Sequence, residues 1–169
     1  MNRLIAVFTF VLLFCSLPAV AQVTPCSLLT QAEIENALGV KLAGFGNGPQ
    51  AGVTRICQGV VKNRLSVMVM FAPSQGPNDR RWADPVGEME RLARESANSV
   101  KAQLEFKRMG PSMVCMTLVP PQPGPYSTQC MVGKKPTGMA AITALVGAQQ
   151  DMVPIEKLRP LAEKMLGRL

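Results

Sequence analysis

The chemistry open to this chain is limited first by a residue type that it lacks, because none of its 169 residues is histidine. Histidine is the commonest general base at neutral pH and a member of the usual catalytic triads. Carboxylate pairs remain, but Glu33 and Glu35 are two residues apart and point to different faces of a helix. Asp79 and Asp84 are typical of a turn and a helix cap. We therefore expect no catalytic residue and no enzyme, with a histidine-free hydrolase as the least favoured class of function.

Methionine is the second residue type with chemistry to offer. Met68 and Met70 lie two apart in a strand-like run, so both thioethers face the same side of the strand. Thioethers are ligands for copper(I), yet methionine is more often the filler of an irregular apolar core. We expect no metal and no cofactor. The favoured functional interpretation of this run is one wall of an apolar pocket for a small apolar ligand.

A second candidate binding surface centres on Trp82, which follows Arg80 and Arg81 in a loop. Tryptophan and arginine dominate the binding energy of protein interfaces, so this loop supplies the alternative function, a protein–protein interaction module. The competing interpretation is that Trp82 covers the first turn of the next helix. The candidate binding residues are these three together with Met68 and Met70.

The N-terminus has the three parts of a secretory signal. Met1–Arg3 is short and positive, Leu4–Leu17 is apolar, and the segment up to Ala21 ends in small residues. A membrane anchor would need about 20 apolar residues, and Pro18 interrupts the run before that length is reached. We expect cleavage after Ala21, leaving a single exported domain over residues 22–169 that is periplasmic or secreted.

The positive charge of the chain is scattered. Its formal net charge is +7, with one tryptophan and one tyrosine in the whole sequence. Nucleic-acid-binding proteins usually gather cations on one face and interleave them with aromatic residues. We expect no nucleic-acid partner and no stable membrane span after signal cleavage. The expected partner is a small apolar ligand or an unidentified protein of the cell envelope.

Four cysteines follow the signal, and an even number in an exported chain predicts disulfides. Their spacing favours Cys26–Cys57 and Cys115–Cys130, one bridge in each half. The second pair has a geometric argument, because two strand-like runs flank a proline-rich loop at 120–125. If those strands pair from the ends of the loop, Cys115 lies directly opposite Cys130, within reach of a bridge.

The elements that must position these residues alternate between helix and strand. Thr30 and Glu33 form a capping box that starts the first helix. The expected helices are Gln31–Leu38, one opened by Asp84 and Pro85, and Ile155–Leu166, with a kink or late start at Pro160. The expected strands are Thr54–Val61, Leu65–Ala72, a short one near Phe106, Ser112–Val119, Tyr126–Val132 and Met139–Val146, the last with a helix as alternative.

These elements predict an α+β fold, an antiparallel sheet with helices packed on it and two disulfides as staples. The segment Ala43–Gly52 is glycine-rich and is expected to be a loop. The run Leu65–Ala72 is apolar on both faces, which predicts a central strand covered on both sides.

The segments Pro25–Thr30, Ala32–Ile34 and Ala37–Gly39, with Cys57 opening a strand, form a recognisable opening. It resembles that of small exported bacterial domains of unknown function found among actinobacterial cell-envelope lipoproteins. The likeness covers about residues 25–72. It implies a Cys26–Cys57 bridge and a compact α+β domain, and it implies no catalytic residues. The chain departs from those domains in lacking a usable lipidation cysteine.

Overall fold

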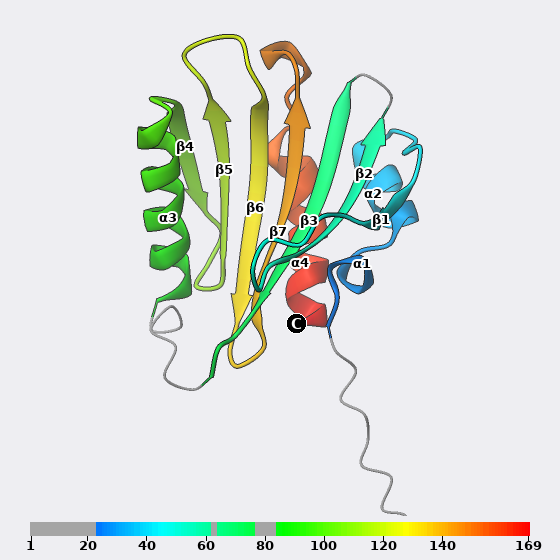
Figure 1. The fold of residues 1–169 in the computed structure, drawn as a ribbon, viewed down its shortest axis with the longest axis vertical. Helices are drawn as coiled ribbons and strands as arrows, with labels where there is room; N and C mark the ends of the chain where they lie inside the picture. The colour runs from blue at the N-terminus through cyan, green and yellow to red at the C-terminus, as the bar shows by residue number, and fades with distance from the viewer. Residues whose placement is uncertain (1–22, 62–63, 77–83) are drawn as a thin grey trace, which may run out of the picture.

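The computed structural model describes residues 23–61, 64–76 and 84–169 (Figure 1). The predicted signal segment and the loop that carries Arg80, Arg81 and Trp82 lie outside these residues, so the expectations about them stay predictions. Within the described part of the chain, no helix has the length and apolar character needed to cross a membrane.

Seven antiparallel strands form one sheet in the order β1-β2-β3-β7-β6-β5-β4. Strand β7 lies between β3 and β6 and thereby joins the N-terminal strands to the C-terminal ones (Figure 1). The strand bounds are β1 Phe45–Asn47, β2 Arg55–Val61, β3 Leu65–Pro73, β4 Gln103–Arg108, β5 Met113–Val119, β6 Tyr126–Lys134 and β7 Gly138–Val146. The α+β fold with an antiparallel sheet is confirmed, and residues 139–146 form a strand rather than a helix.

The helices are divided unequally between the two faces of the sheet (Figure 1). Three of them pack on one face, which we call the helix-covered face, while α3 alone packs on the other, which we call the groove face. The helix bounds are α1 Pro25–Leu28, α2 Gln31–Leu38, α3 Pro85–Ser99 and α4 Ile155–Arg168.

The main core lies between the sheet and α4. Val67, Val69 and Ile142 point from the central strands toward Leu158 and Met165 of the helix, and all five side chains are fully buried. The apolar residues of α4 recur at helical spacing, so one stripe of the helix is buried while its charged residues face solvent.

The capping signals of α2 are confirmed. The Thr30 side chain accepts a hydrogen bond from the Glu33 backbone amide, and the Glu33 carboxylate accepts one from the Thr30 amide at 2.9 Å. Gly39 ends the helix in the left-handed conformation at φ 69°.

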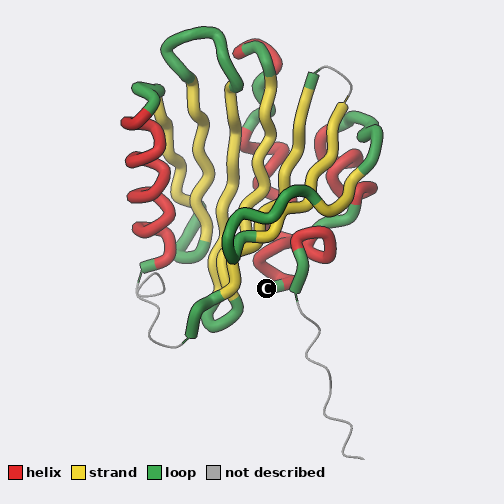
Figure 2. The backbone as a smooth tube through the Cα atoms, in the orientation of Figure 1, coloured by secondary structure: helices red, strands yellow, loops and turns green. Residues whose placement is uncertain are grey.

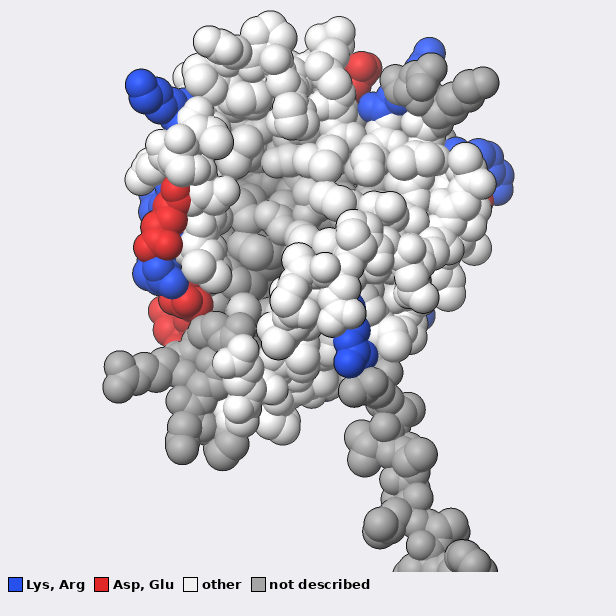
Figure 3. Space-filling model, viewed as in Figure 1, with Lys and Arg blue, Asp and Glu red and all other residues white. Residues whose placement is uncertain are grey.

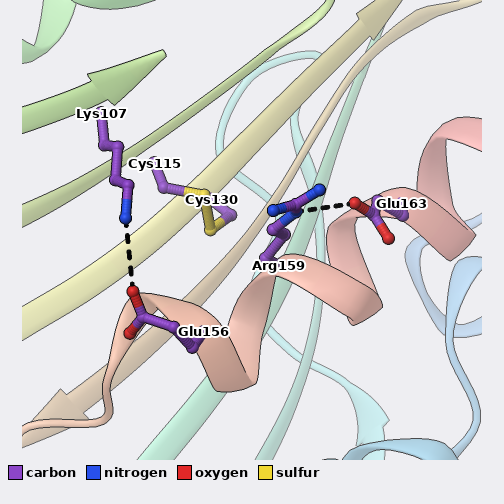
Figure 4. Close-up of a disulfide and its surroundings, with 6 residues drawn as sticks. All are labelled: Lys107, Cys115, Cys130, Glu156, Arg159 and Glu163. Carbon is purple, nitrogen blue, oxygen red and sulfur yellow. Dashed lines mark hydrogen bonds and ion pairs between the residues drawn. A yellow bond between two sulfur atoms is a disulfide. The ribbon is translucent and has the colours of Figure 1, made fainter. Parts of the chain in front are cut away.

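Both expected disulfides are present. Cys26 bonds Cys57 with a Cα–Cα distance of 5.2 Å, and Cys115 bonds Cys130 at 4.1 Å. Strands β5 and β6 pair Cys115 directly with Cys130, as the hairpin argument predicted. This bridge lies on the helix-covered face close to α4, where Lys107 of β4 pairs with Glu156 (Figure 4). Two disulfides fit an oxidising compartment.

Three expectations need correction. Strand β1 lies inside the segment Ala43–Gly52 that was expected to be a loop, because its glycines carry no side-chain pattern while its backbone pairs with β2. Helix α1 was not predicted, since four residues are too short for a helical periodicity. Helix α4 starts at Ile155 and runs through Pro160, so a late start is wrong.

Glu33 links α2 to α4, and its replacement tests that link. Its carboxylate accepts hydrogen bonds from Arg168 at 2.8 Å and Lys164 at 3.2 Å. The Arg168 guanidinium, with further help from the Thr30 amide, holds the pKa of Glu33 well below its ordinary 4.5. We expect Glu33→Gln to lower the free energy of unfolding by about 1–2 kcal/mol at neutral pH.

A carboxylate whose pKa is lowered by folding stabilises the protein at pH values above its ordinary pKa. For Glu33 this contribution is lost as the pH falls below about 4.5. The difference in the free energy of unfolding between wild type and Glu33→Gln should therefore become smaller in acid. Urea denaturation between neutral pH and pH 3 measures this difference. Glu163→Gln is the control, because Glu163 pairs only within α4 with Arg159 on an exposed surface. A difference that stays constant with pH would show that the charge of Glu33 is not what joins the helices.

Candidate functional site

A groove on the sheet results from the incomplete cover that α3 provides. Val86 and Met89 of α3 pack against Val114 of β5, with Phe106 and Met131 beside them. The helix contacts β4, β5 and β6, which leaves the adjoining part of the groove face without a helix. Figure 3 shows this face hollowed next to α3, with uncharged side chains lining the depression.

The hollow has a volume of about 260 Å³. Its floor comes from β3, β7 and β6, and α3 forms one wall. The connection between β1 and β2 passes in front of the sheet (Figure 2), and Thr54 at its end lines the hollow as well. The lining residues are Thr54, Met70, Ala72, Met89, Leu92, Gln129, Met131, Met139, Ala140 and Ala141.

Methionines surround Ala141 at the floor of this hollow. Met70 of β3 and Met131 of β6 both pair with Ala141, one from each side, because β7 runs between their strands. Met139 lies two residues before Ala141 on the same strand and therefore on the same face. Met89 adds a buried thioether from α3. The small Ala141 side chain leaves the space into which these longer ones can lean.

The two methionines chosen from the sequence have different positions. Met70 lines the hollow, whereas Met68 lies on the same face one pair of residues further along β3, opposite Gln58 and Thr143. Both are only half-buried, so the expectation that β3 is covered on both sides is wrong. The physical reason is that no helix packs over this part of the groove face. Whether Met68 and Met70 bind a ligand stays a prediction.

Sequence reasoning missed Met89, Met131 and Met139. The hairpin register placed Met131 on the face opposite to the disulfide, but nothing local indicated that β7 would bring Ala141 and Met139 beside it. The pairing of β7 with β3 is a long-range contact, and it brings Met70 to the part of the floor that β6 and β7 form.

Polar groups are few in and beside the hollow. Gln129 lines it, and its cross-strand neighbour Thr143 is 6% exposed with a hydroxyl that has no hydrogen-bond partner among the described residues. A buried hydroxyl without a partner is unusual and leaves one donor and one acceptor open. The Thr143 side chain faces the groove side of β7, because it lies two residues beyond Ala141.

Ion pairs occupy the outer surface of α3. Arg91 bonds both Glu88 and Glu95, and the Glu90 carboxylate accepts two hydrogen bonds from Arg108. The Arg108 guanidinium lowers the pKa of Glu90, so this ion pair persists in mild acid. In Figure 3 red and blue side chains line the edge of the hollow formed by α3 and stand at several other places on the rim of this face, while the hollow itself is white. None of the lining residues in the described part of the chain carries a charge.

No group of three or more histidine, cysteine, aspartate or glutamate residues suited to a metal ion occurs in the described ranges 23–61, 64–76 and 84–169. No family model matches the chain, and neither the curated proteins nor the solved structures gave a match. The resemblance of residues 25–72 to actinobacterial lipoprotein domains therefore stays a prediction.

Proposed function

We propose that this protein is an exported, non-enzymatic binding protein of the bacterial cell envelope, and that the groove beside α3 holds a small, neutral, apolar ligand. The observation that carries the proposal is the hollow itself, an apolar part of the sheet that its helix leaves open and whose described lining residues are all uncharged. Apolar surface of this kind on an exported domain is typical of a ligand-binding or interaction site.

The size of the hollow supports a small molecule. Ligand pockets usually measure about 300–1,000 Å³, and this one lies just under that range. The floor is deep where Ala72 and Ala141 stand, since both side chains are small. The flexible methionine side chains around them can adapt to an irregular ligand, as methionine does at many binding surfaces.

The charge pattern supports a neutral molecule. Moving a charged group out of water without a partner is costly, and among the described residues that line the hollow none could supply an opposite charge. The Gln129 side chain can form hydrogen bonds with one neutral polar group at the β6 side of the groove. A mostly apolar ligand with a single hydroxyl or carbonyl group fits this arrangement.

The first measurement is the native mass of the protein recovered from its own exported compartment, compared with its denatured mass. An added mass that is lost on denaturation supports a carrier and identifies its ligand. The same spectra check the start at Gln22 and the two disulfides. A bare chain that also fails to bind neutral apolar fluorescent probes would contradict the proposal.

Filling the hollow tests where the ligand binds. We expect Ala141→Leu to weaken binding of a neutral naphthylamine probe at least about tenfold, because the larger side chain occupies the floor. Ser127→Leu is the matched control, since the Ser127 side chain points from β6 to the groove face of the sheet but does not line the hollow. Fluorescence titration of both variants, with thermal melts to confirm folding, gives the answer. Equal affinity of Ala141→Leu and wild type would place the ligand elsewhere.

A further inference from the structure

We infer that the thioethers around Ala141 form a binding site for copper(I), with silver(I) as its redox-silent analogue. This inference does not depend on the apolar ligand proposed above. It follows from the arrangement of Met70, Met131 and Met139 on the floor and of Met89 in the wall, which brings four thioethers to one hollow.

The strand register brings three of these sulfur atoms within reach of one point. Neighbouring strands lie about 4.8 Å apart, so the backbones of Met70 and Met131 are about 10 Å apart with only Ala141 between them. Met139 lies about 7 Å from Ala141 along β7 on the same face. A methionine side chain has three rotatable bonds, which allow the three sulfurs to converge above the Ala141 methyl group.

The donor set selects the metal. Thioethers are soft, uncharged ligands that favour copper(I), whereas zinc and copper(II) prefer imidazole, thiolate or carboxylate groups. None of these three groups occurs among the lining residues that the structure describes. The four cysteines of the described domain, which would otherwise compete for copper(I), are held in disulfides. A single positive charge is also the smallest that a metal can bring into an uncharged groove.

The positions of the other methionines sharpen the inference. Met113 and Met165 are buried in the main core, and Met109 and Met152 pack against it, as expected of residues that fill an irregular interior. The three floor methionines are half-buried like Met109 and Met152, but they lie next to one another around an open hollow. Filling a core does not require sulfur at such positions, whereas coordinating a metal does.

Thioethers also predict an unusual dependence on pH. Metal affinity normally falls in acid because cysteine, histidine and carboxylate ligands take up protons. A thioether has no proton to exchange in this range. The affinity for copper(I) should therefore stay constant between about pH 4 and pH 8, which separates this site from one built on cysteine, histidine or carboxylate ligands.

The experiment uses the mature, disulfide-intact protein, titrated without oxygen with copper(I) against a chromophoric copper(I) chelator, and with silver(I) by calorimetry. We expect one ion per chain at both pH limits, an all-sulfur shell by X-ray absorption, and no binding of zinc. Absence of copper(I) and silver(I) binding by wild type at micromolar concentration, or nitrogen and oxygen ligands in the absorption spectrum, would overturn the inference.

Leucine substitutions separate this site from the apolar pocket. The triple variant Met70→Leu, Met131→Leu and Met139→Leu keeps apolar volume but removes three sulfurs. We expect at least about a hundredfold loss of copper(I) affinity with little change in binding of the naphthylamine probe. The control triple variant Met109→Leu, Met113→Leu and Met165→Leu should keep copper(I) affinity. Equal losses of copper(I) affinity in the two triple variants would overturn the inference. The apolar pocket would still be tested separately by Ala141→Leu.

Discussion

Removing the Cys26–Cys57 disulfide by a double alanine substitution should lower the free energy of unfolding by about 3.7 kcal/mol. The bridge spans 31 residues, and closing a loop of that length restricts the unfolded chain. Cys57 is fully buried on β2, so the bridge also ties α1 to the core. The loss would be a large part of the 5–15 kcal/mol that stabilises a typical domain. Guanidinium denaturation without reductant measures it.

The Cys115–Cys130 double alanine variant is the matched comparison. Its bridge spans 15 residues, which gives an expected loss of about 3.0 kcal/mol. The two variants should also differ locally, because β5 and β6 remain paired along their length without their bridge. Only the Cys26–Cys57 variant should become open to proteolysis near α1. Wild-type stability of that variant would show that the bridge restricts the unfolded chain little.

The parts of the fold that could be predicted from the sequence are those with local physical signals. Thr30, Glu33 and Gly39 define α2 at both ends because a capping box and a left-handed glycine act within a few residues. The β5–β6 register follows from the ends of its loop, and the Cys115–Cys130 bridge follows from that register. Each of these features depends on neighbours in the sequence.

The order of the strands had no such signal. Pairing of β3 with β7 joins segments that are far apart in the chain, and the largely apolar sequence of β7 would suit several partners equally well. The groove floor depends on this one pairing, because Met70 reaches Ala141 only through it. Met68 and Met70 could therefore be singled out from the sequence as a methionine pair, but the methionines that join Met70 around the hollow could not.

The position of α3 on the sheet could not be predicted from the sequence either. Its sequence shows a capped helix with a narrow apolar stripe, in which Val86, Met89 and Ala97 are buried while Leu92 is 44% exposed. A stripe of this width can pack on either face of a sheet and at several positions across it. The open groove results from where the helix packs, which is decided by contacts with Phe106 and Val114.

A second large effect is expected at Gly138, which starts β7 and precedes the groove residues Met139 and Ala141. Its φ of 155° is reached by few other residues, and an added Cβ would lie 2.5 Å from the Ala72 carbonyl oxygen and 2.8 Å from the Phe71 ring. We expect Gly138→Ala to lower the free energy of unfolding by about 2–4 kcal/mol, from backbone strain together with overpacking.

Gly110→Ala separates the two causes, because Gly110 has a φ of 120° but nothing within 4 Å of its added Cβ. That variant should lose only the conformational part, about 1–2 kcal/mol. The additional loss of stability in Gly138→Ala arises where β7 contacts β3. Relief of this clash must move β7 away from Ala72 and widen the floor beneath Ala141. Binding of the naphthylamine probe should therefore weaken in Gly138→Ala and stay unchanged in Gly110→Ala. Equal stability of the two variants would show that β3 and β7 can separate without cost, and the groove would then lack the rigid floor on which its selectivity depends.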